Sequence, residues 1–545
     1  MHGLMMDTPL LVSSILRHAD RNFPDREIVS VTADNPAHRY SYRECIERTR
    51  QLANALTKLN LAQGDRIATL AWNDYRHLEA YYAIGGAGYV CHTVNPRLFP
   101  EQIIFMINHA EDRWVLTDPM FVPLLEQIAD KTPGVEGYVV LTDDDHMPET
   151  GLRNAISYEA LIRDESGDYE WPQIDEREAV ALCYTSGTTG DPKGVLYSHR
   201  STLLHAYAGI APDVLNLSNR DSVLPVVPLF HVNAWGIPYS ALMVGAKLVF
   251  PGPKMGDGEA LYHMLEAEEV SLALGVPTVW LGLLQYAEKA GKKMNALQRT
   301  VIGGAAVPES MIRDFRTKHD VVVVQGWGMT EMSPLGTVNV PKAGMESMPL
   351  DEMFALQTKA GRGIFGVDMR IVDDAGNELP WDGVAFGPLQ VRGPWICSDY
   401  FKLDGSGGAH TPDGWFDTGD VATIDGNGYM QITDRTKDVI KSGGEWISSI
   451  EVENTAIGHP AVAEAAVIGV AHSKWTERPL LVIVREEGKE PSKEELLAWF
   501  DGKIAKWWVP DDVVFVDQIP HTATGKIKKT ELREQFAGHR LPTEA

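Results

Sequence analysis

The chain of 545 residues has 44% apolar and 23% charged residues, and its 75 acidic side chains against 49 basic ones give a net charge of −26. This length predicts two or more domains, and the composition is typical of a soluble globular protein. The acidic balance argues against a nucleic-acid-binding protein, but not against a nucleotide-binding enzyme, which needs only a local cluster of donors and a metal ion.

Four cysteines lie far apart along the chain, without the paired spacing of a zinc site: Cys45, Cys91, Cys183 and Cys397. Scattered cysteines in a large chain fit a reducing compartment better than a disulfide framework. Met1–Asp20 has no basic region ahead of an apolar block, and no run approaches 18 apolar residues, so we expect neither a signal peptide nor a membrane span. The expected location is the cytoplasm.

Residues 40–180 alternate helical patterns with short apolar runs. Ser41–Asn60 has leucines at helical spacing and leads into the strand-like run Arg66–Ala71. A further strand-like run, Ala179–Tyr184, ends in a stretch that is dense in Gly, Ser and Thr.

This stretch, Tyr184–Gly194, reads Tyr-Thr-Ser-Gly-Thr-Thr-Gly-Asp-Pro-Lys-Gly. Its glycines allow sharp turns that bring N–H groups to an anion, its hydroxyls add donors, and Lys193 adds a positive charge, so the loop is equipped to hold a triphosphate. The spacing is not that of a Walker A loop. The composition alone is also compatible with a flexible surface loop that binds no ligand. The residues expected to bind the nucleotide here are Thr185, Ser186, Gly187, Thr188, Thr189, Gly190 and Lys193.

The alternation resumes between residues 220 and 330. Five runs read as short buried strands: Val223–Pro228, Lys247–Phe250, Leu272–Val276, Thr300–Gly303 and Val321–Val324. Repeated alternation of this type predicts a layered α/β fold with mostly parallel sheets. After the first of these strands, His231 and Trp235 stand at helical i, i+4 spacing. A histidine in this position is also compatible with a purely structural role.

From about residue 361 to residue 434, Gly, Pro and Asp interrupt short alternating runs such as Met369–Val372 and Leu389–Val391, which predicts an antiparallel, barrel-like section. The literal G-x-G-x-x-G at Gly361–Gly366 is followed by a strand-like run, Val367–Val372, and not by a helix. We therefore interpret it as a turn and not as a dinucleotide fingerprint.

The last 109 residues look like a separate small α+β domain. Val462–Val470 and Leu480–Glu486 read as strands, and Ser492–Ala505 reads as a helix opened by a Ser/Glu capping pattern. A polar joint at Arg435–Asp438 separates this region from the rest. The predicted domains are residues 1–436, a large α/β domain of layered subdomains with the barrel-like section, and residues 437–545.

The loop at 184–194 is very similar to the signature of the adenylate-forming enzymes: the acyl-CoA synthetases, firefly-type luciferases and peptide-synthetase adenylation domains. Further segments match this superfamily in the expected order over essentially the whole chain: Gly303–Pro308, Gly326–Glu331, Trp415–Asp420, Asp434–Asp438, Lys441–Trp446 and Thr522–Lys526. The segment His-Val-Asn-Ala-Trp at 231–235 most resembles the corresponding segment of the medium-chain fatty acid–CoA ligases and of the methylmercaptopropionate–CoA ligases.

The resemblance implies further residues that bind ATP or AMP: Gly304, Ala305, Ala306, Gly326, Trp327, Gly328, Met329, Thr330, Asp420, Ile432, Arg435 and Lys526. In the family, the aromatic ring at Trp327 packs on adenine, and many relatives have Tyr there. Asp420 accepts both ribose hydroxyls, a task that suits a carboxylate. Without the family, Trp327 is more often a core residue and Asp420 a turn residue.

Three residues are implied as catalytic: Lys526, Thr330 and Glu331. Thr330 contacts the α-phosphate, and Glu331, together with Thr185, is expected to bind Mg²⁺. Lys526 suits its role because adenylation gathers charge on the carboxylate, the α-phosphate and pyrophosphate, which a positioned cation stabilises.

The implied acyl pocket comprises His231, Val232, Trp235, Gly303, Trp327 and Met332. The implied CoA-side loop comprises Lys441, Ser442, Gly443, Gly444, Glu445 and Trp446. The mobile C-terminal domain is expected to rotate about the hinge at Lys437.

The implied activity is that of an ATP-dependent acid–CoA ligase that forms an acyl-adenylate and then an acyl-CoA, with ATP, Mg²⁺ and coenzyme A as cofactors or co-substrates. Two tryptophans in the pocket favour a short- to medium-chain apolar acid, and a thioether such as 3-methylthiopropionate would suit aromatic walls. The alternatives are an enzyme that loads a separate carrier protein, a luciferase-like oxygenase, and a non-catalytic nucleotide or acid sensor. A homodimer is compatible with the resemblance.

Overall fold

The computed structural model describes residues 1, 3–185, 191–345, 347–403, 408–443, 445–521 and 527–544, with the backbone alone at 445 and 544. The chain divides into two compact units. Unit 1 comprises Met1–Thr185, Asp191–Asp368 and Arg392–Gly408. Unit 2 includes Met369–Val391 and Ala409–Ala545.

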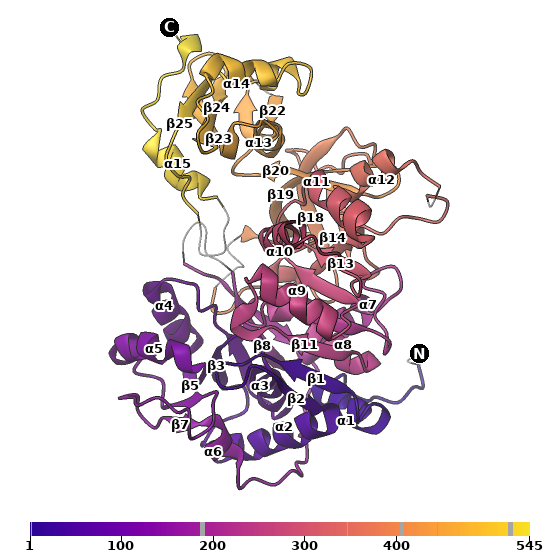
Figure 1. The fold of residues 1–545 in the computed structure, drawn as a ribbon, viewed down its shortest axis with the longest axis vertical. Coiled ribbons are helices and arrows are strands. Elements are labelled where there is room, and N and C mark those ends of the chain that lie inside the picture. Colours follow the sequence, from indigo (N-terminus) through magenta and orange to yellow (C-terminus); the bar gives the residue numbers. More distant parts are fainter. Residues whose placement is uncertain are drawn as a thin grey trace. The chain divides into compact units, whose positions relative to one another are not determined.

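The larger sheet of unit 1 has nine strands in the order β16-β15-β14-β13-β12-β10-β11-β1-β2 (Figure 1). The six strands from β14 to β1 are parallel, and antiparallel strands cover both edges. Their bounds are β1 Glu27–Ser30, β2 His38–Ser41, β10 Ser222–Pro225, β11 Lys247–Phe250, β12 Leu272–Gly275, β13 Arg299–Ile302, β14 Val322–Gly328, β15 Leu335–Val338 and β16 Arg362–Gly363. All five predicted runs lie in this sheet, which confirms the mostly parallel arrangement.

A second sheet of unit 1 has seven strands in the order β7-β6-β5-β3-β4-β8-β9. All its pairs are parallel except the β8–β9 hairpin. The bounds are β3 Arg66–Leu70, β4 Val90–Thr93, β5 Asp112–Thr117, β6 Gly137–Val140, β7 Ile156–Ser157, β8 Ala179–Tyr184 and β9 Gly194–Ser198. The hairpin places the predicted phosphate loop at the end of β8.

Helices connect these strands, as the alternating pattern predicts. The predicted helix at 41–60 is confirmed as α2, and the Ser41 side chain caps it together with Glu44. The helices of unit 1 are α1 Val12–Asn22, α2 Tyr42–Thr57, α3 Tyr75–Gly86, α4 Pro100–Ala110, α5 Val122–Ile128, α6 Tyr158–Ile162, α7 His199–Gly209, α8 Ile237–Val244, α9 Gly258–Ala267, α10 Pro277–Ala290, α11 Glu309–Asp314 and α12 Leu350–Gln357.

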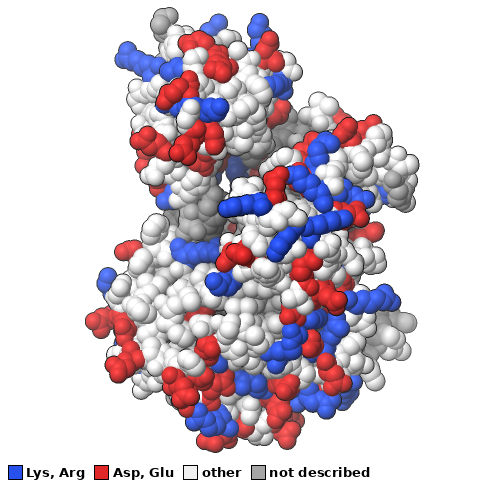
Figure 2. All heavy atoms as spheres, viewed as in Figure 1, with Lys and Arg blue, Asp and Glu red and all other residues white. Residues whose placement is uncertain are grey.

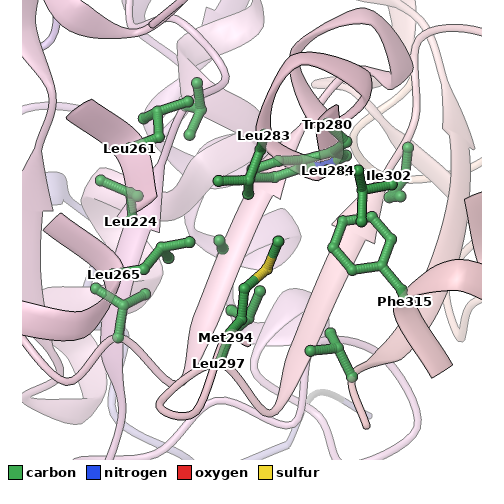
Figure 3. Close-up of a cluster of buried hydrophobic side chains, with 14 of the residues drawn as sticks. Leu224, Leu261, Leu265, Trp280, Leu283, Leu284, Met294, Leu297, Ile302 and Phe315 are labelled. Atoms are coloured by element: carbon green, nitrogen blue, oxygen red, sulfur yellow. The ribbon is translucent and has the colours of Figure 1, made fainter. Parts of the chain in front are cut away.

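A hydrophobic core of unit 1 lies between the nine-stranded sheet and helices α9 and α10 (Figure 3). Leu224 and Ile302 project from the strands, and Leu261, Trp280 and Leu283 project from the helices; all five are buried. Each such side chain contributes roughly 1.5–3 kcal/mol when it is fully buried. This packing makes β10, β12 and β13 a rigid support for the loops that leave their C-terminal ends.

The glycine-rich stretch at 361–366 is not a dinucleotide motif, as predicted. It contains β16 and leads into β17, Asp368–Ile371, and no helix follows. Gly361 has a φ of +98°, and an added Cβ would lie 2.1 Å from the Val338 carbonyl carbon. Glycine is required here because the chain crosses β15 at close range.

Unit 2 contains the predicted antiparallel section and the predicted small α+β region. The first is a four-stranded sheet in the order β17-β18-β19-β20, with β18 Phe386–Arg392, β19 Phe416–Ile424 and β20 Met430–Arg435. The second is a five-stranded sheet formed by β21 Ile440–Ser442, β22 Glu445–Ile447, β23 Val462–His472, β24 Thr476–Arg485 and β25 Asp512–Phe515. Its α-helices are α13 Ser449–Ile457, α14 Lys493–Trp499 and α15 Lys529–Gln535.

The predicted helix at 492–505 is too long. Ser492 caps α14 as expected, but the helix ends at Trp499, whose indole N–H bonds the Thr455 carbonyl oxygen at 2.8 Å. Phe500 then turns into the core, and Gly502 has a φ of +70°. Tertiary packing of these side chains overrides the helical pattern of the sequence.

In the described part of the chain, no helix is both long enough and apolar enough to cross a membrane. On the face drawn in Figure 2, acidic and basic side chains intermingle. The described residues therefore present no continuous basic surface on this face of the kind that nucleic-acid binding requires.

Candidate functional site

The base of the phosphate loop is closed by a reciprocal pair of hydrogen bonds. The Thr185 N–H donates to the Lys193 carbonyl oxygen at 2.9 Å, and the Lys193 N–H donates to the Thr185 hydroxyl oxygen at 3.1 Å. Both residues continue the β8–β9 hairpin, in which Tyr184 pairs with Gly194. The loop residues between them, Ser186, Gly187, Thr188, Thr189 and Gly190, lie outside the described residues.

The segment after β13 presents its backbone at the surface. Gly304, Ala305 and Ala306 are exposed, whereas Gly303 is buried. Gly304 has a φ of +81°, so the chain turns there in a conformation that favours glycine. These three residues carry at most a methyl group, so they form an exposed strip of small residues.

The segment Gly326–Glu331 begins inside a strand, whereas the sequence predicts that it follows one. β14 runs on to Gly328 and pairs antiparallel with β15, with a bulge between Trp327 and Gly328. Gly328 is required at this point, because an added Cβ would lie 1.9 Å from the Pro334 carbonyl oxygen. The bulge turns the chain into a short 3-10 turn that carries Thr330, Glu331 and Met332.

The segment at the expected acyl wall is a left-handed turn and not the right-handed helix that the i, i+4 spacing suggested. Val232, Asn233, Ala234 and Trp235 have φ values of +42°, +51°, +46° and +56°, while His231 is extended. A β-branched residue in this region is strained, and backbone strain of this type is typical of ligand-binding sites.

Buried polar groups hold this turn. The Asn233 side-chain oxygen accepts from the Tyr81 hydroxyl at 3.1 Å and from the Cys183 Sγ at 3.2 Å. Cys183 lies on β8, two residues before Thr185, so this network connects the end of β8 to the turn at 232–235. Sequence reasoning missed Asn233 and Tyr81, because only the tertiary fold brings them together.

Two glycines let tryptophan rings close against the backbone. A Cβ added at Gly303 would lie 2.8 Å from the Gly326 carbonyl oxygen and 3.1 Å from the Trp235 ring. A Cβ added at Gly336 would lie 2.6 Å from the Met332 methyl group and 2.7 Å from the Trp327 ring. The structure therefore brings Trp235 to Gly303, and Trp327 to Met332, while their role in an acyl pocket stays a prediction.

Glu331 is buried and anchored by a residue that the sequence analysis did not single out. The Tyr400 hydroxyl donates to the Glu331 Oε1 at 2.7 Å, and the Cys397 N–H donates to the Glu331 carbonyl oxygen at 2.7 Å. The Tyr197 hydroxyl holds the neighbouring Thr330 by donating to its carbonyl oxygen at 2.6 Å. Mg²⁺ prefers oxygen ligands such as carboxylates and hydroxyls, so the carboxylate of Glu331 fits the expected ion.

In unit 2, two of the predicted nucleotide residues face each other on neighbouring strands. Asp420 on β19 and Arg435 on β20 are paired across the sheet, and the Arg435 Nε lies 2.9 Å from the Asp420 Oδ1. Ile432 follows the same ladder, opposite Ala422. The guanidinium orients a carboxylate that is 5% exposed.

Lys437 lies in the turn between β20 and β21, where the Asp438 and Val439 N–H groups both donate to the Arg435 carbonyl oxygen. The CoA-side loop that follows is a tight hairpin. Lys441 pairs with Trp446, and its Nζ lies 5.1 Å from the centre of that ring.

The turn of this hairpin is at Gly443, with a φ of +63°, where an added Cβ would lie 2.7 Å from the Trp475 ring. Ser442 is buried, while Gly444 and the side chain of Glu445 lie outside the description, as does the predicted catalytic residue Lys526.

Known proteins share this architecture and much of this sequence. Residues 16–401 match the family model for the AMP-binding enzymes, and residues 451–526 match the model for the AMP-binding enzyme C-terminal domain. A 3-methylmercaptopropionyl-CoA ligase of Ruegeria lacuscaerulensis is 54% identical over 98% of this chain and 99% of its own length. A medium-chain-fatty-acid–CoA ligase of Ectopseudomonas oleovorans is 51% identical over 98% of each chain. The crystal structure of ATP-bound MatB from Rhodopseudomonas palustris is 26% identical, with a TM-score of 0.81 over 97% of this chain and 99% of that chain.

The layered α/β fold, with its glycine-rich loops at strand ends and its small C-terminal α+β region, is that of an adenylate-forming enzyme. The chain belongs to the AMP-binding enzyme family. Within this family it is an AMP-forming acid–CoA ligase.

Proposed function

We propose that this ligase activates a short- to medium-chain apolar acid, including the thioether acid 3-methylthiopropionate. The observation that carries the proposal is the close packing of Trp235 on Gly303 and of Trp327 beside Met332. Two indole rings packed against the backbone favour a short pocket. Contact with an aromatic ring stabilises a thioether sulfur by about 0.3–1.5 kcal/mol. The two relatives named for 3-methylmercaptopropionyl-CoA and medium-chain fatty acids support the same range.

In the proposed reaction, the carboxylate of the acid attacks the α-phosphorus of ATP, and pyrophosphate leaves. The thiolate of CoA then attacks the acyl carbon of the adenylate, and AMP leaves. We assign the β- and γ-phosphates to the loop that Thr185 and Lys193 close, the adenine to Trp327 and the strip at 304–306, and the ribose hydroxyls to Asp420.

The catalytic assignments follow the family resemblance. Thr330 would contact the α-phosphate, and Lys526 would stabilise the negative charge of the adenylation transition state. Glu331 and Thr185 would hold a Mg²⁺ ion, which supplies neutralising charge to the phosphates when it is bound. His231 and Val232 would line the acid.

We also propose a domain boundary at Lys437. Residues 1–436 would bind ATP and the acid, and residues 437–545 would carry Lys526 and the CoA-side loop at 441–446. Gly444 of that loop would let pantetheine pass, since a side chain there would block the channel. A cytoplasmic location stays a prediction of the sequence.

A substrate panel scored by CoA-dependent AMP release tests the proposal. The panel contains 3-methylthiopropionate and straight-chain acids from butanoate to hexadecanoate. We expect kcat/KM to peak among the thioether acid and the short to medium chains, and AMP release to need CoA. A steady rise of kcat/KM through hexadecanoate would overturn the short pocket, and a need for a carrier protein in place of CoA would overturn the thiol acceptor.

A further inference from the structure

The segment 395–401 ties the phosphate loop of unit 1 to the turn that carries Glu331. At one end, the Trp395 indole N–H donates to the Leu335 carbonyl oxygen at 3.0 Å, and the Ser333 hydroxyl donates to the Trp395 carbonyl oxygen at 2.9 Å. At the other end, the Phe401 N–H donates to the Gly194 carbonyl oxygen at 2.8 Å. One short segment is therefore hydrogen-bonded both to Gly194, at the end of the phosphate loop, and to the residues that follow the Glu331 turn.

Within this segment, the side chain of Tyr400 contacts a functional residue on each side. Its hydroxyl donates to the Glu331 Oε1 at 2.7 Å, and the Lys193 Nζ lies 4.7 Å from the centre of its ring. Tyr400 is 7% exposed and Glu331 is 6% exposed, so their hydrogen bond is shielded from water. Lys193 is exposed, and the ring face gives its ammonium a defined resting position.

We propose that Tyr400 is a positioning residue that sets the separation between the phosphate-binding charge of Lys193 and the metal-binding carboxylate of Glu331. The inference rests on the functions proposed above for these two residues. A free carboxylate samples several rotamers, whereas a short hydrogen bond to one oxygen holds its plane. The same side chain contacts both charges, so its place in the fold determines the surroundings of both.

The conservative variant Tyr400→Phe removes the hydrogen bond and keeps the ring under Lys193. We expect the Mg²⁺ concentration for half-maximal ATP–pyrophosphate exchange to rise about tenfold, the scale of one hydrogen bond to a charged group. Calorimetric binding of ATP in EDTA should stay within about twofold, while binding of ATP with Mg²⁺ weakens by about the same factor as exchange. The thioester step from preformed acyl-adenylate should be unaffected.

Two further variants separate the two contacts. Tyr400→Leu removes the ring as well, so ATP binding in EDTA should now also weaken. Lys193→Gln should weaken ATP binding in EDTA to a similar degree. Lys193→Arg keeps a cation over the ring, so its ATP binding should stay close to that of the unchanged protein. Tyr286→Phe is the matched control, because it removes a hydroxyl that bonds Glu259 at 3.3 Å on the exposed face of α10.

The outcomes distinguish this inference from the function on which it rests. If Glu331→Gln leaves the Mg²⁺ dependence unchanged, the metal role of Glu331 fails. If Glu331→Gln raises the Mg²⁺ requirement but Tyr400→Phe behaves like Tyr286→Phe, the positioning role fails. A lower thermal unfolding temperature of Tyr400→Phe with unchanged Mg²⁺ dependence would show a purely structural tyrosine and would also overturn the proposal. Should the Tyr400 variants not fold, the exposed Lys193 variants test the same spacing from the other side of the ring.

Discussion

Gly303 determines how closely the turn at 232–235 approaches β14. Its missing side chain allows the Trp235 ring and the Gly326 carbonyl oxygen to meet at the same point, with contacts of 3.1 and 2.8 Å to an added Cβ. A backbone oxygen is unable to move aside as the end of a flexible side chain does. Glycine at position 303 is therefore a steric requirement of this packing, independent of any role in binding.

We expect Gly303→Ala to lower kcat/KM for every acid by about tenfold or more, because overpacking of this kind costs about 1–3 kcal/mol. Steady-state assays over the substrate panel provide the measurement. Gly282→Ala on α10 is the control, since an added Cβ there meets nothing within 4 Å. Unchanged kinetics in Gly303→Ala would show that β14 and the Trp235 turn shift freely.

At the scale of elements, the ladder between β19 and β20 decides the placement of Asp420. Cross-strand pairing puts Arg435 directly opposite, and the ion pair at 2.9 Å fixes one carboxylate oxygen. A carboxylate held in this way accepts hydroxyl protons in a defined direction.

We expect the preference for ATP over 2′-deoxy-ATP to be about tenfold smaller in Asp420→Asn than in the unchanged protein, because an amide replaces a charged acceptor of the ribose hydroxyls. The ratio of kcat/KM for the two nucleotides measures the effect and cancels any general loss of activity. Asp382→Asn, in an exposed turn of unit 2, should leave the ratio unchanged. An equal loss with both nucleotides would contradict ribose recognition by Asp420.

A second feature at this scale is a buried charged cluster that joins β20, α13 and α15. The Lys529 Nζ lies 2.7 Å from the Glu453 Oε1 and donates to the Ser449 hydroxyl, which in turn donates to Asp434 at 3.0 Å. Burial raises the pKa of Asp434 and of Glu453, and Lys529 counteracts the increase at both. In the folded protein, both carboxyls therefore keep their protons at pH values above their ordinary pKa values of 3.8 and 4.5. Their contribution to stability is complete below these ordinary pKa values, and it falls as the pH rises through the raised pKa values of the folded state.

We expect Lys529→Met to destabilise unit 2 by about 3–5 kcal/mol at pH 8, because buried carboxylates then lack a counter-ion. Without Lys529 their pKa values rise further, so the loss should shrink as pH falls toward 5 and the carboxyls become neutral. Thermal unfolding at several pH values checks this. Lys528→Met, the neighbouring lysine paired with Glu531 near the surface, should cost far less at every pH. A penalty that does not depend on pH would argue for lost packing alone.

At the scale of the whole molecule, the two half-reactions assign different work to the two proposed domains. Lys437 lies between β20 and β21, and its φ must change if the C-terminal domain rotates there. Proline at this position would hold φ near −65°.

We expect Lys437→Pro to keep adenylate formation within about threefold and to lower thioester formation from preformed adenylate by about 100-fold or more, because that step depends on rotation about the hinge. Lys526→Ala should give the reverse pattern, with adenylation nearly abolished and the thioester step largely retained. ATP–pyrophosphate exchange and single-turnover acyl transfer measure the two steps, and Lys437→Ala is the flexible control. Equal losses in both steps for either variant would refute the division of labour.

Much of the fold follows from local pattern. Short apolar runs such as Lys247–Phe250 form buried parallel strands, because a parallel sheet pairs their backbone groups and covers both of their faces. The strand β14 is longer than its apolar run predicts. The two glycines of Gln-Gly-Trp-Gly have low strand propensity, and pairing of Gln325 with β13 and of Gly326–Gly328 with β15 extends the strand. The left-handed turn at 232–235 could not be predicted because its support, Tyr81 and Cys183, is distant in sequence.

The sequence by itself determined the family, the layered α/β class and the order of the motifs, because these depend on residue types and spacings along the chain. The tertiary structure decided what holds the motifs: Tyr400 reaches Glu331 across 69 residues, and Asn233 binds Cys183 across 50. Such contacts arise from the packing of strands and loops that are distant in sequence, and they leave no local signal. The chemistry can therefore be predicted from the motifs, but the geometry that supports it requires the fold.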